Sequence, residues 1–243
     1  DRRSRVMRLK FKKYIFEKQT DRLMRKIFLV FIMLMSGIVS AQTAKEIIEK
    51  NIELSGGLTN WKLLNSITLQ GRLTLGINDN YPIKIFQERP NLTKTVITIN
   101  KKETAIEGYD GKKGYAMNYA TNKLQEYPNY VAESFDTDFI DWESKGFEAN
   151  YLGKEKVGET ICHKVELIKN VNKTLYYFDV KTYMLLKEVK SDEALLYSDY
   201  RKIGSLMMPY RIESSSPKKD SDYVILLNKI ETNKVLPANT FKF

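Results

Sequence analysis

Few residues in this chain are suited to acid–base or nucleophilic chemistry. His163 is the only histidine and Cys162 is the only cysteine. They are neighbours in an alternating segment, and successive side chains of a strand point to opposite faces, so they cannot form a local thiol–imidazole pair. His163 is better explained as a core or cavity-wall residue than as a catalytic base. We therefore predict no catalytic residue.

Carboxylates gather on one segment, at Asp136, Asp138 and Asp141. Such a cluster could hold Ca²⁺ in principle, but the segment lacks the spacing and the central glycine of a calcium loop. A solvated helix face explains it better, and we expect no metal and no cofactor. Paired carboxylates from distant strands could still serve glycoside hydrolysis, and the sequence leaves that alternative open.

The basic charge is concentrated at the N-terminus. The chain carries a net charge of +10, of which residues 1–41 contribute +8 and the remainder +2. A protein that reads the phosphate backbone needs a basic surface on its folded part. Because the rest of the chain is close to neutral, we expect no nucleic-acid partner.

Residues 24–41 have the pattern of a secretory signal. Arg25 and Lys26 precede an apolar run over residues 27–35, and small residues end at Ala41. The alternative is a membrane anchor, but the run is shorter than the roughly 20 residues that a spanning helix needs. We predict a signal peptide cleaved after Ala41 and a periplasmic protein.

The remainder divides simply. We expect residues 1–23 to be a non-native or disordered basic extension, the alternative being a cytoplasmic basic tail. No linker or low-complexity tract interrupts residues 42–243, which we expect to form one domain.

Two amphipathic helices are expected. Thr43 and Glu46 form a capping box, and Ile47 and Ile48 begin an apolar stripe behind it. In the segment 130–145, three aromatic residues recur at helical spacing with acidic residues between them, which predicts a second helix with an acidic outer face. These aromatic residues are Phe135, Phe139 and Trp142.

Most of the remaining chain alternates with a period of two. Residues 67–75 place apolar side chains on one face and polar ones on the other, and short strands separated by turns follow through residue 235. This spacing is typical of an antiparallel barrel or sandwich in a mainly β (α+β) protein. If the helices pack fully against the sheet, the result is an ordinary core; if they cover it as a lid, an apolar pocket for acyl chains remains.

Several short motifs resemble the periplasmic lipoprotein carrier LolA and its outer-membrane lipoprotein-sorting relatives. An Arg-Pro-Asn turn ends a strand, and an Asp-Gly-Lys hairpin follows about 20 residues later. The matching residues are 89–92, 109–118, 178–183, 200–204 and 208–210. The similarity covers most of residues 42–243.

The resemblance implies an incomplete antiparallel β-barrel of roughly 10–11 strands, with the N-terminal and central helices as a lid. It also implies a monomeric carrier of acylated lipoproteins or other lipids, passing them from an inner-membrane exporter to an outer-membrane acceptor. The expected lipid-binding residues of the wall and lid are Ile67, Leu69, Leu73, Leu75, Ile83, Ile85, Phe135, Phe139, Trp142, Ile47 and Ile48.

Two other functions stay open. The same fold serves in envelope regulators that sense lipids or bind a protein partner, so the fold alone does not decide the function. A hydrolase is the third hypothesis, and it requires two acidic side chains that face one another inside the cavity. The sequence does not identify the cargo or the docking partners.

Overall fold

A computed structural model describes residues 43–76, 79–118, 120–128, 130, 132, 134–191, 193–216 and 222–243. The predicted signal peptide and the basic extension lie outside the described residues. Within the described part, residues 43–243 belong to one compact unit.

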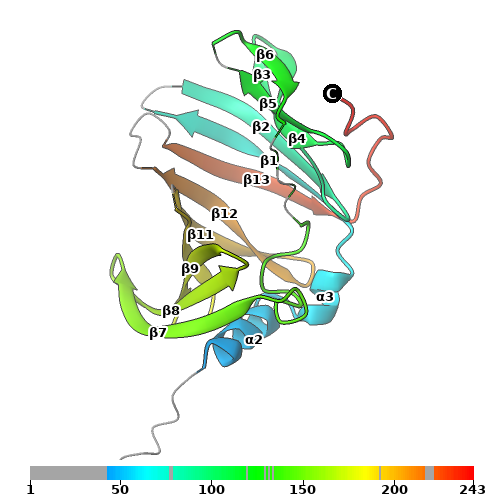
Figure 1. Ribbon diagram of the computed structural model, residues 1–243. Coiled ribbons are helices and arrows are strands. Elements are labelled where there is room, and N and C mark those ends of the chain that lie inside the picture. Colours follow the sequence, from blue (N-terminus) through cyan, green and yellow to red (C-terminus); the bar gives the residue numbers. More distant parts are fainter. Residues whose placement is uncertain are drawn as a thin grey trace, which may run out of the picture. The chain divides into compact units, whose positions relative to one another are not determined.

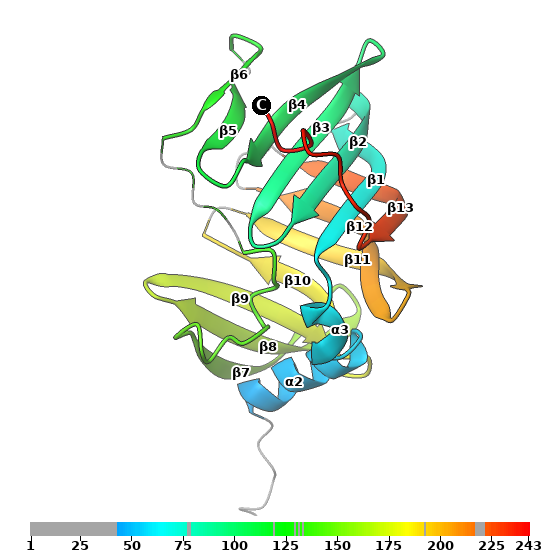
Figure 2. The same ribbon diagram turned by 90° about the vertical axis from the view of Figure 1, so that its right-hand side faces the viewer.

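The unit is built on a single antiparallel sheet with the strand order β6-β5-β4-β3-β2-β1-β13-β12-β11-β10-β9-β8-β7 (Figures 1 and 2). The sheet has 13 strands, rather than the 10–11 expected, although its mainly β character was predicted correctly. The strands are β1 (Ser66–Leu75), β2 (Asp79–Glu88), β3 (Leu92–Ile99), β4 (Lys102–Tyr109), β5 (Gly114–Asn118), β6 (Lys123–Glu126), β7 (Glu148–Val157), β8 (Thr160–Lys169), β9 (Asn172–Asp179), β10 (Leu185–Val189), β11 (Ala194–Ile203), β12 (Leu206–Ser215) and β13 (Tyr223–Thr232).

The sheet is an incomplete barrel, because its two edge strands do not pair with each other. These edges are β6 and β7, which follow one another in the chain. We call residues 134–147, which lie between them, the strap. The strap begins beside the turn after β2, where the Phe135 N–H donates to the Pro90 carbonyl, and Figures 1 and 2 show it continuing toward β7. The open side is therefore spanned by irregular chain instead of a backbone ladder.

Alternation along each strand gives the sheet an inner and an outer face. In β1, Leu69 lies opposite Ile85 of β2 and Ile230 of β13, and Leu73 lies opposite Tyr81 and Ile225 of the same strands. Because paired residues share a face, the apolar positions add up across strands into one inner surface. This surface carries a first apolar cluster, whose buried members are Leu64, Ile67, Leu73, Ile83, Ile97, Leu206, Met208, Tyr210, Ile225, Leu227 and Ile230.

The first helix, α2 (Ala44–Leu54), forms as predicted. Glu46 donates its backbone N–H to the Thr43 hydroxyl, and the Glu46 carboxylate accepts from the Thr43 N–H, which completes the capping box. Ile47 and Ile48 are fully buried in a second apolar cluster, on strands β7 to β9. This helix therefore packs on the far part of the sheet, not over β1 and β2. The second cluster comprises Ala44, Ile47, Ile48, Phe139, Val165, Leu167, Tyr176 and Phe178.

A sharp corner links α2 to the short helix α3 (Leu58–Lys62). Strands β12 and β13 pair only over residues 211–213 and 224–226, so the first residues of β12 have no partner in β13. The corner lies beside these first residues of β12. There Met207 donates its N–H to the Ser55 carbonyl at 2.8 Å, so the corner occupies hydrogen-bonding positions that β13 leaves free. Gly56 permits this approach, because a Cβ atom there would lie 2.7 Å from the Ser205 carbonyl oxygen. None of the described helices is long and apolar enough to span a bilayer.

The central helix predicted over residues 130–145 does not form. Residues 138–146 form consecutive turns, with hydrogen bonds of different spacing, such as Ile140 N–H to the Thr137 carbonyl and Phe147 N–H to the Trp142 carbonyl. Asp141 takes a left-handed conformation with φ of 53°, which ends any helical run. The aromatic spacing was therefore a correct sign of burial and a wrong sign of helix.

The close approach of the paired strands β1 and β13 at Gly71 leads to a first prediction. A Cβ atom at Gly71 would lie 2.2 Å from the Leu226 carbonyl oxygen and 2.8 Å from the Leu227 Cα atom. Because both are backbone atoms beside a bulge in the register, the strands must move apart to admit it. Gly71→Ala should lower the free energy of unfolding by about 1–3 kcal/mol in urea titration. Arg72→Ala, at an exposed position of the same strand, should leave the stability within about 0.5 kcal/mol, and equal effects would contradict the argument.

Candidate functional site

All six predicted wall residues lie in the first apolar cluster. Ile67, Leu73 and Ile83 are buried, while the other three pack against them and remain partly exposed. Those three are Leu69, Leu75 and Ile85. The structure thus brings the wall residues together on the inner face of β1 and β2.

The predicted lid residues divide between the two clusters. Phe135 packs against the first cluster, together with Trp61 of α3. Ile47, Ile48, Phe139 and Trp142 instead belong to, or pack against, the second cluster on β7 to β9. The expectation of one lid over one wall is therefore wrong in its arrangement, because only Phe135 meets the wall.

Arg89 joins three parts of the molecule at the first cluster. It lies just past the end of β2, and its Nε donates to the Leu64 carbonyl at 2.6 Å while Nη2 donates to the Trp61 carbonyl at 3.0 Å. Both terminal nitrogens also bind the Asp136 carboxylate of the strap, at 2.7 and 2.6 Å. One guanidinium therefore satisfies the end of α3 and holds the strap by a bidentate ion pair.

The strap is also held by apolar and backbone contacts at this point. The guanidinium lies over the Phe135 ring, 4.9 Å from its centroid. The Phe135 N–H donates to the Pro90 carbonyl at 3.0 Å. Side-chain and backbone contacts from residues 89 and 90 thus fix Phe135 against the wall.

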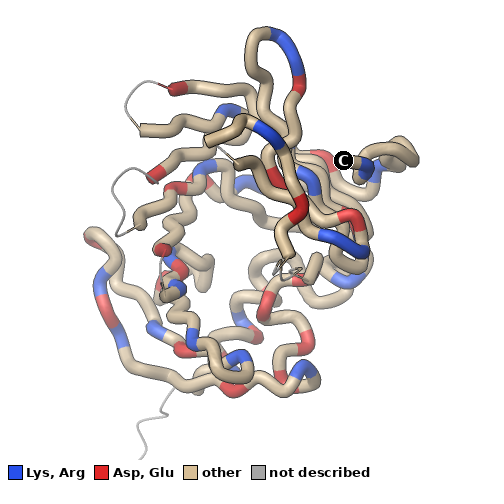
Figure 3. Tube along the Cα trace, turned by 45° about the horizontal axis from the view of Figure 1, so that its top comes forward, with Lys and Arg blue, Asp and Glu red and all other residues tan. Residues whose placement is uncertain are grey.

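The other acidic residues of the strap pair with cations from different elements. Asp141 meets Lys62 of α3 at 2.8 Å, and Glu143 meets Lys45 of α2 at 3.0 Å. Figure 3 shows that acidic and basic residues are interspersed along the described chain. The strap is therefore attached to both helices as well as to the sheet.

Asp138 makes the most buried of these attachments. It accepts from Lys169 at 2.6 Å and from the Tyr176 hydroxyl at 2.5 Å. Burial works against its ionisation, but the hydrogen bonds from Lys169 and Tyr176 outweigh burial, and the pKa of Asp138 is lowered. The prediction that the three aspartates form only a solvated face is therefore wrong.

A polar row lies on the inner face of β10 and β11, between the two apolar clusters. The Tyr197 hydroxyl donates to Glu188 at 2.9 Å, and the Glu188 side chain also meets Lys190 at 3.4 Å. Burial raises the pKa of Tyr197, with a further contribution from Glu188. Nearby, Glu193 accepts from Ser214 at 2.6 Å. Burial and the Glu193 carboxylate raise the pKa of Tyr223 to about 12.

This polar row carries no free acid–base pair. Each of the inward carboxylates Asp138, Glu188 and Glu193 is engaged by a hydroxyl group. No group of three or more metal-ligating side chains is found among the described residues. The row is best understood as a satisfied polar network that separates the two apolar clusters.

His163 is a buried residue of the inner face, as the sequence predicted. Its side chain is 2% exposed, its Nδ1 lies 3.2 Å from the Tyr151 hydroxyl, and its ring stacks on Tyr183 with centroids 5.6 Å apart. The Tyr183 carbonyl accepts a hydrogen bond from Asn51 of α2 at 2.7 Å. His163 therefore supports the segment on which α2 is anchored.

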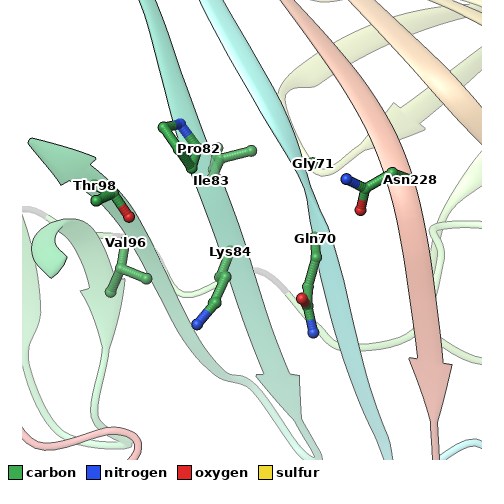
Figure 4. A pocket seen from close by; sticks show the side chains of 8 residues that line it. All are labelled: Gln70, Gly71, Pro82, Ile83, Lys84, Val96, Thr98 and Asn228. Carbon is green, nitrogen blue, oxygen red and sulfur yellow. The ribbon is translucent and has the colours of Figure 1, made fainter. Parts of the chain in front are cut away.

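A shallow pocket of about 180 Å³ lies on the outer face, beside the β1 bulge (Figure 4). It combines amide groups with a hydroxyl and an ammonium group over a small apolar floor. Lys84 is already paired with Glu103 at 2.5 Å, so the pocket offers no strong free charge. The lining residues are Gln70, Gly71, Pro82, Ile83, Lys84, Val96, Thr98 and Asn228.

Comparison with known proteins places the fold. No family model matches the sequence, and no curated protein matches it. Among solved structures, an outer membrane lipoprotein-sorting protein domain from Vibrio parahaemolyticus superposes with a TM-score of 0.53 at 11% identity, covering 82% of this chain and 96% of that one. A LolA superfamily protein from Nitrosomonas europaea gives a TM-score of 0.53 at 14% identity, covering 84% and 99%. The described chain has a LolA-like fold.

A DUF1329 family protein from Desulfovibrio piger is similar to a comparable degree, with a TM-score of 0.52 at 10% identity, covering 82% and 97%. At such identities the likeness shows the fold alone. The LolA-like fold agrees with the incomplete barrel expected from the sequence.

The residue that sequence reasoning missed is Arg89. The Arg-Pro-Asn turn was recognised only as the end of a strand. The available signal was an arginine beside a turn in a chain whose strap carries several acids. What the sequence could not supply was the pairing of Arg89 with Asp136, 47 residues away.

Loss of the Arg89 junction should release the strap. Arg89→Met keeps the length of the side chain but leaves the Asp136 carboxylate and the Trp61 and Leu64 carbonyls without this donor. We expect the unfolding free energy to fall by about 2 kcal/mol. The Phe135 amide should exchange its hydrogen faster, as measured by hydrogen–deuterium exchange. Lys84→Met removes an exposed ion pair and serves as the control; the same change in strap exchange there would contradict the assignment.

Stability should depend on pH through His163. Burial lowers its pKa, with a smaller effect of Lys154 in the same direction, while Asp179 opposes both. The unfolded chain therefore binds a proton at higher pH than the folded chain, so the unfolding free energy falls as pH drops below about 6.5. Urea titrations between pH 7.5 and 5.5 should show this loss in the wild type and a smaller one in His163→Phe. Identical pH profiles would refute the role of His163.

Proposed function

We propose that this chain is an exported carrier that binds the acyl chains of lipoproteins or other lipids on the inner face of its incomplete barrel. In this proposal the domain begins at residue 42 after cleavage behind Ala41, works as a monomer in the periplasm, and has no catalytic role. It takes cargo from an inner-membrane exporter and delivers it to an outer-membrane acceptor.

The observation that carries the proposal is the way the barrel closes. An inner apolar surface of many strands meets a side where β6 and β7 do not pair, and a strap held by side chains spans that side. Removing the strap breaks ion pairs and a few hydrogen bonds but no ladder of the sheet. Such a design suits a surface that must be covered at one time and exposed at another.

In the proposed cycle, the structure corresponds to the closed state. Trp61 and Phe135 pack on the wall residues that an acyl chain would cover. Loading would move these two rings away with α3 and the strap, once Arg89 releases them. Each CH₂ group that replaces them on the wall would contribute about 0.8 kcal/mol, so no charged anchor in the wall is needed.

One feature favours a second candidate, a partner-binding envelope module of the same fold. Strand β7 is an edge of 10 residues whose backbone pairs only with β8 in the described sheet. An extended segment of another protein could add to that edge. This candidate predicts a stable stoichiometric complex and no change in lipoprotein localisation on depletion.

The carrier is tested by two measurements. Native mass spectrometry of protein purified from cell envelopes should reveal bound lipid, and a fluorescent fatty acid should bind the delipidated protein. Leu69→Gln, in the wall, should weaken binding of the fluorescent acid by about tenfold, because it places an amide against the acyl chain. Phe135→Ala should strengthen it, because it vacates part of the wall.

The matched control is Leu226→Gln, the same exchange on the outer face of β13, where the side chain is 41% exposed. It should leave the affinity unchanged. Absence of co-purified lipid together with absence of probe binding would reject the carrier. A co-purified protein in fixed ratio would favour the second candidate.

A further inference from the structure

Exposed apolar side chains gather at the corner between α2 and α3. Leu54 and Leu58 are 45% and 42% exposed, Leu63 is 61% exposed and Val235 is 99% exposed. Single exposed apolar residues are ordinary on protein surfaces, but four at one corner are not scattered singly. We call these four residues the corner patch.

Hydrogen bonds hold the separate segments of the corner patch together. The Asn233 side chain accepts from the Asn65 N–H at 2.7 Å and donates to the Leu63 carbonyl at 3.1 Å. The Ser66 hydroxyl donates to the Lys234 carbonyl at 2.7 Å. The chain next to Leu63 and the chain next to Val235, 172 positions apart in the sequence, are therefore tied together.

The rim of the corner patch is basic. Lys234 precedes Val235, and Lys202 lies at the end of β11, opposite the Met207 residue that bonds to Ser55. Both lysines are exposed, and in the described part of the chain neither forms an ion pair. Two further lysines, Lys50 and Lys62, are neutralised by Glu53 and Asp141. Lys202 and Lys234 are therefore the lysines of this rim that no ion pair engages within the described chain.

We propose that the corner patch docks on the surface of an anionic lipid bilayer. Apolar side chains with a lysine rim match the boundary between headgroups and acyl chains, where both kinds of residue are stabilised. The occupant that fits the corner patch is a lipid surface rather than a folded partner.

This inference rests on the proposed carrier function, and it adds that the cargo is exchanged at a membrane surface. Leu63 lies between Trp61 and Leu64, whose carbonyls bind the Arg89 guanidinium. Inserting Leu63 into a bilayer would pull on the chain that Arg89 holds. Docking would thereby place the strap, and the Arg89 side chain that holds it, close to the lipid surface.

The test uses a local reporter on the full chain, because residues 27–35 are themselves apolar and could bring it to a membrane. Leu63→Cys is labelled with an environment-sensitive fluorophore, while the native Cys162 is buried. Vesicles of phosphatidylcholine with a quarter phosphatidylglycerol should shift its emission to the blue. Val171→Cys, a 90% exposed site on the turn between β8 and β9, is the matched control and should not shift.

Removing the basic rim should weaken docking selectively. In the Leu63→Cys background, Lys202→Gln and Lys234→Gln should each raise the anionic lipid concentration for half the shift by about fivefold. Lys112→Gln and Lys181→Gln, at exposed positions elsewhere, should not. High salt should reduce the shift of the parent and have less effect on the variants.

The outcomes separate this inference from the carrier. A fluorescent fatty acid that binds without any blue shift at position 63 overturns docking and leaves the carrier intact. A shift at position 63 without binding of the fatty acid supports docking and rejects the carrier. Equal shifts at positions 63 and 171, or a shift produced only by an added protein partner, overturn docking.

Discussion

Closure of the sheet by side chains is the constraint on which the rest of the structure depends. Because β6 and β7 do not pair, the only covalent connection across the open side is the chain between them, and its described part is fixed by Arg89 and Asp136. This pair is half-buried, so it is screened less than a surface pair and more than a core pair. The barrel is thereby closed by contacts of intermediate strength, which can hold the strap and also be broken.

The inner face is divided, and this division limits what it can bind. The first apolar cluster belongs to β1 to β3, β12 and β13, while α2 fills the inner face of β7 to β9 with the second. The polar row of Glu188 and Tyr197 lies between them. A buried carboxylate that already has its partners is costly to cover with hydrocarbon. In the proposed carrier, an acyl chain would therefore be confined to the first cluster, the part that the strap and α3 cover.

The sequence predicted the strands and the capped helix well, because those depend on local patterns. Alternation placed Ile67, Leu69 and Leu73 on one face, and the Thr43 capping box marked the start of α2. The central helix was wrong because Phe135 and Phe139 have helical spacing but pack on different clusters, which a single helix face could not reach. The local pattern indicated that these rings are buried. It carried no information on which apolar cluster each ring joins.

The same distinction explains the aspartates of the strap. In a helix, Asp138 and Asp141 would be neighbours three residues apart and their charges would repel, while Asp136 would point away from both. In the structure each meets a cation from a different element, Arg89, Lys169 or Lys62. Ion pairs of partly exposed groups contribute little individually, and we expect a strap secured by them, by isolated hydrogen bonds such as that from Phe135 to Pro90, and by a few rings to open at a lower free energy than the ladders around it. The acidic character of the strap is thus what attaches it to three separate elements, and in the proposed carrier these are the contacts that would break on release.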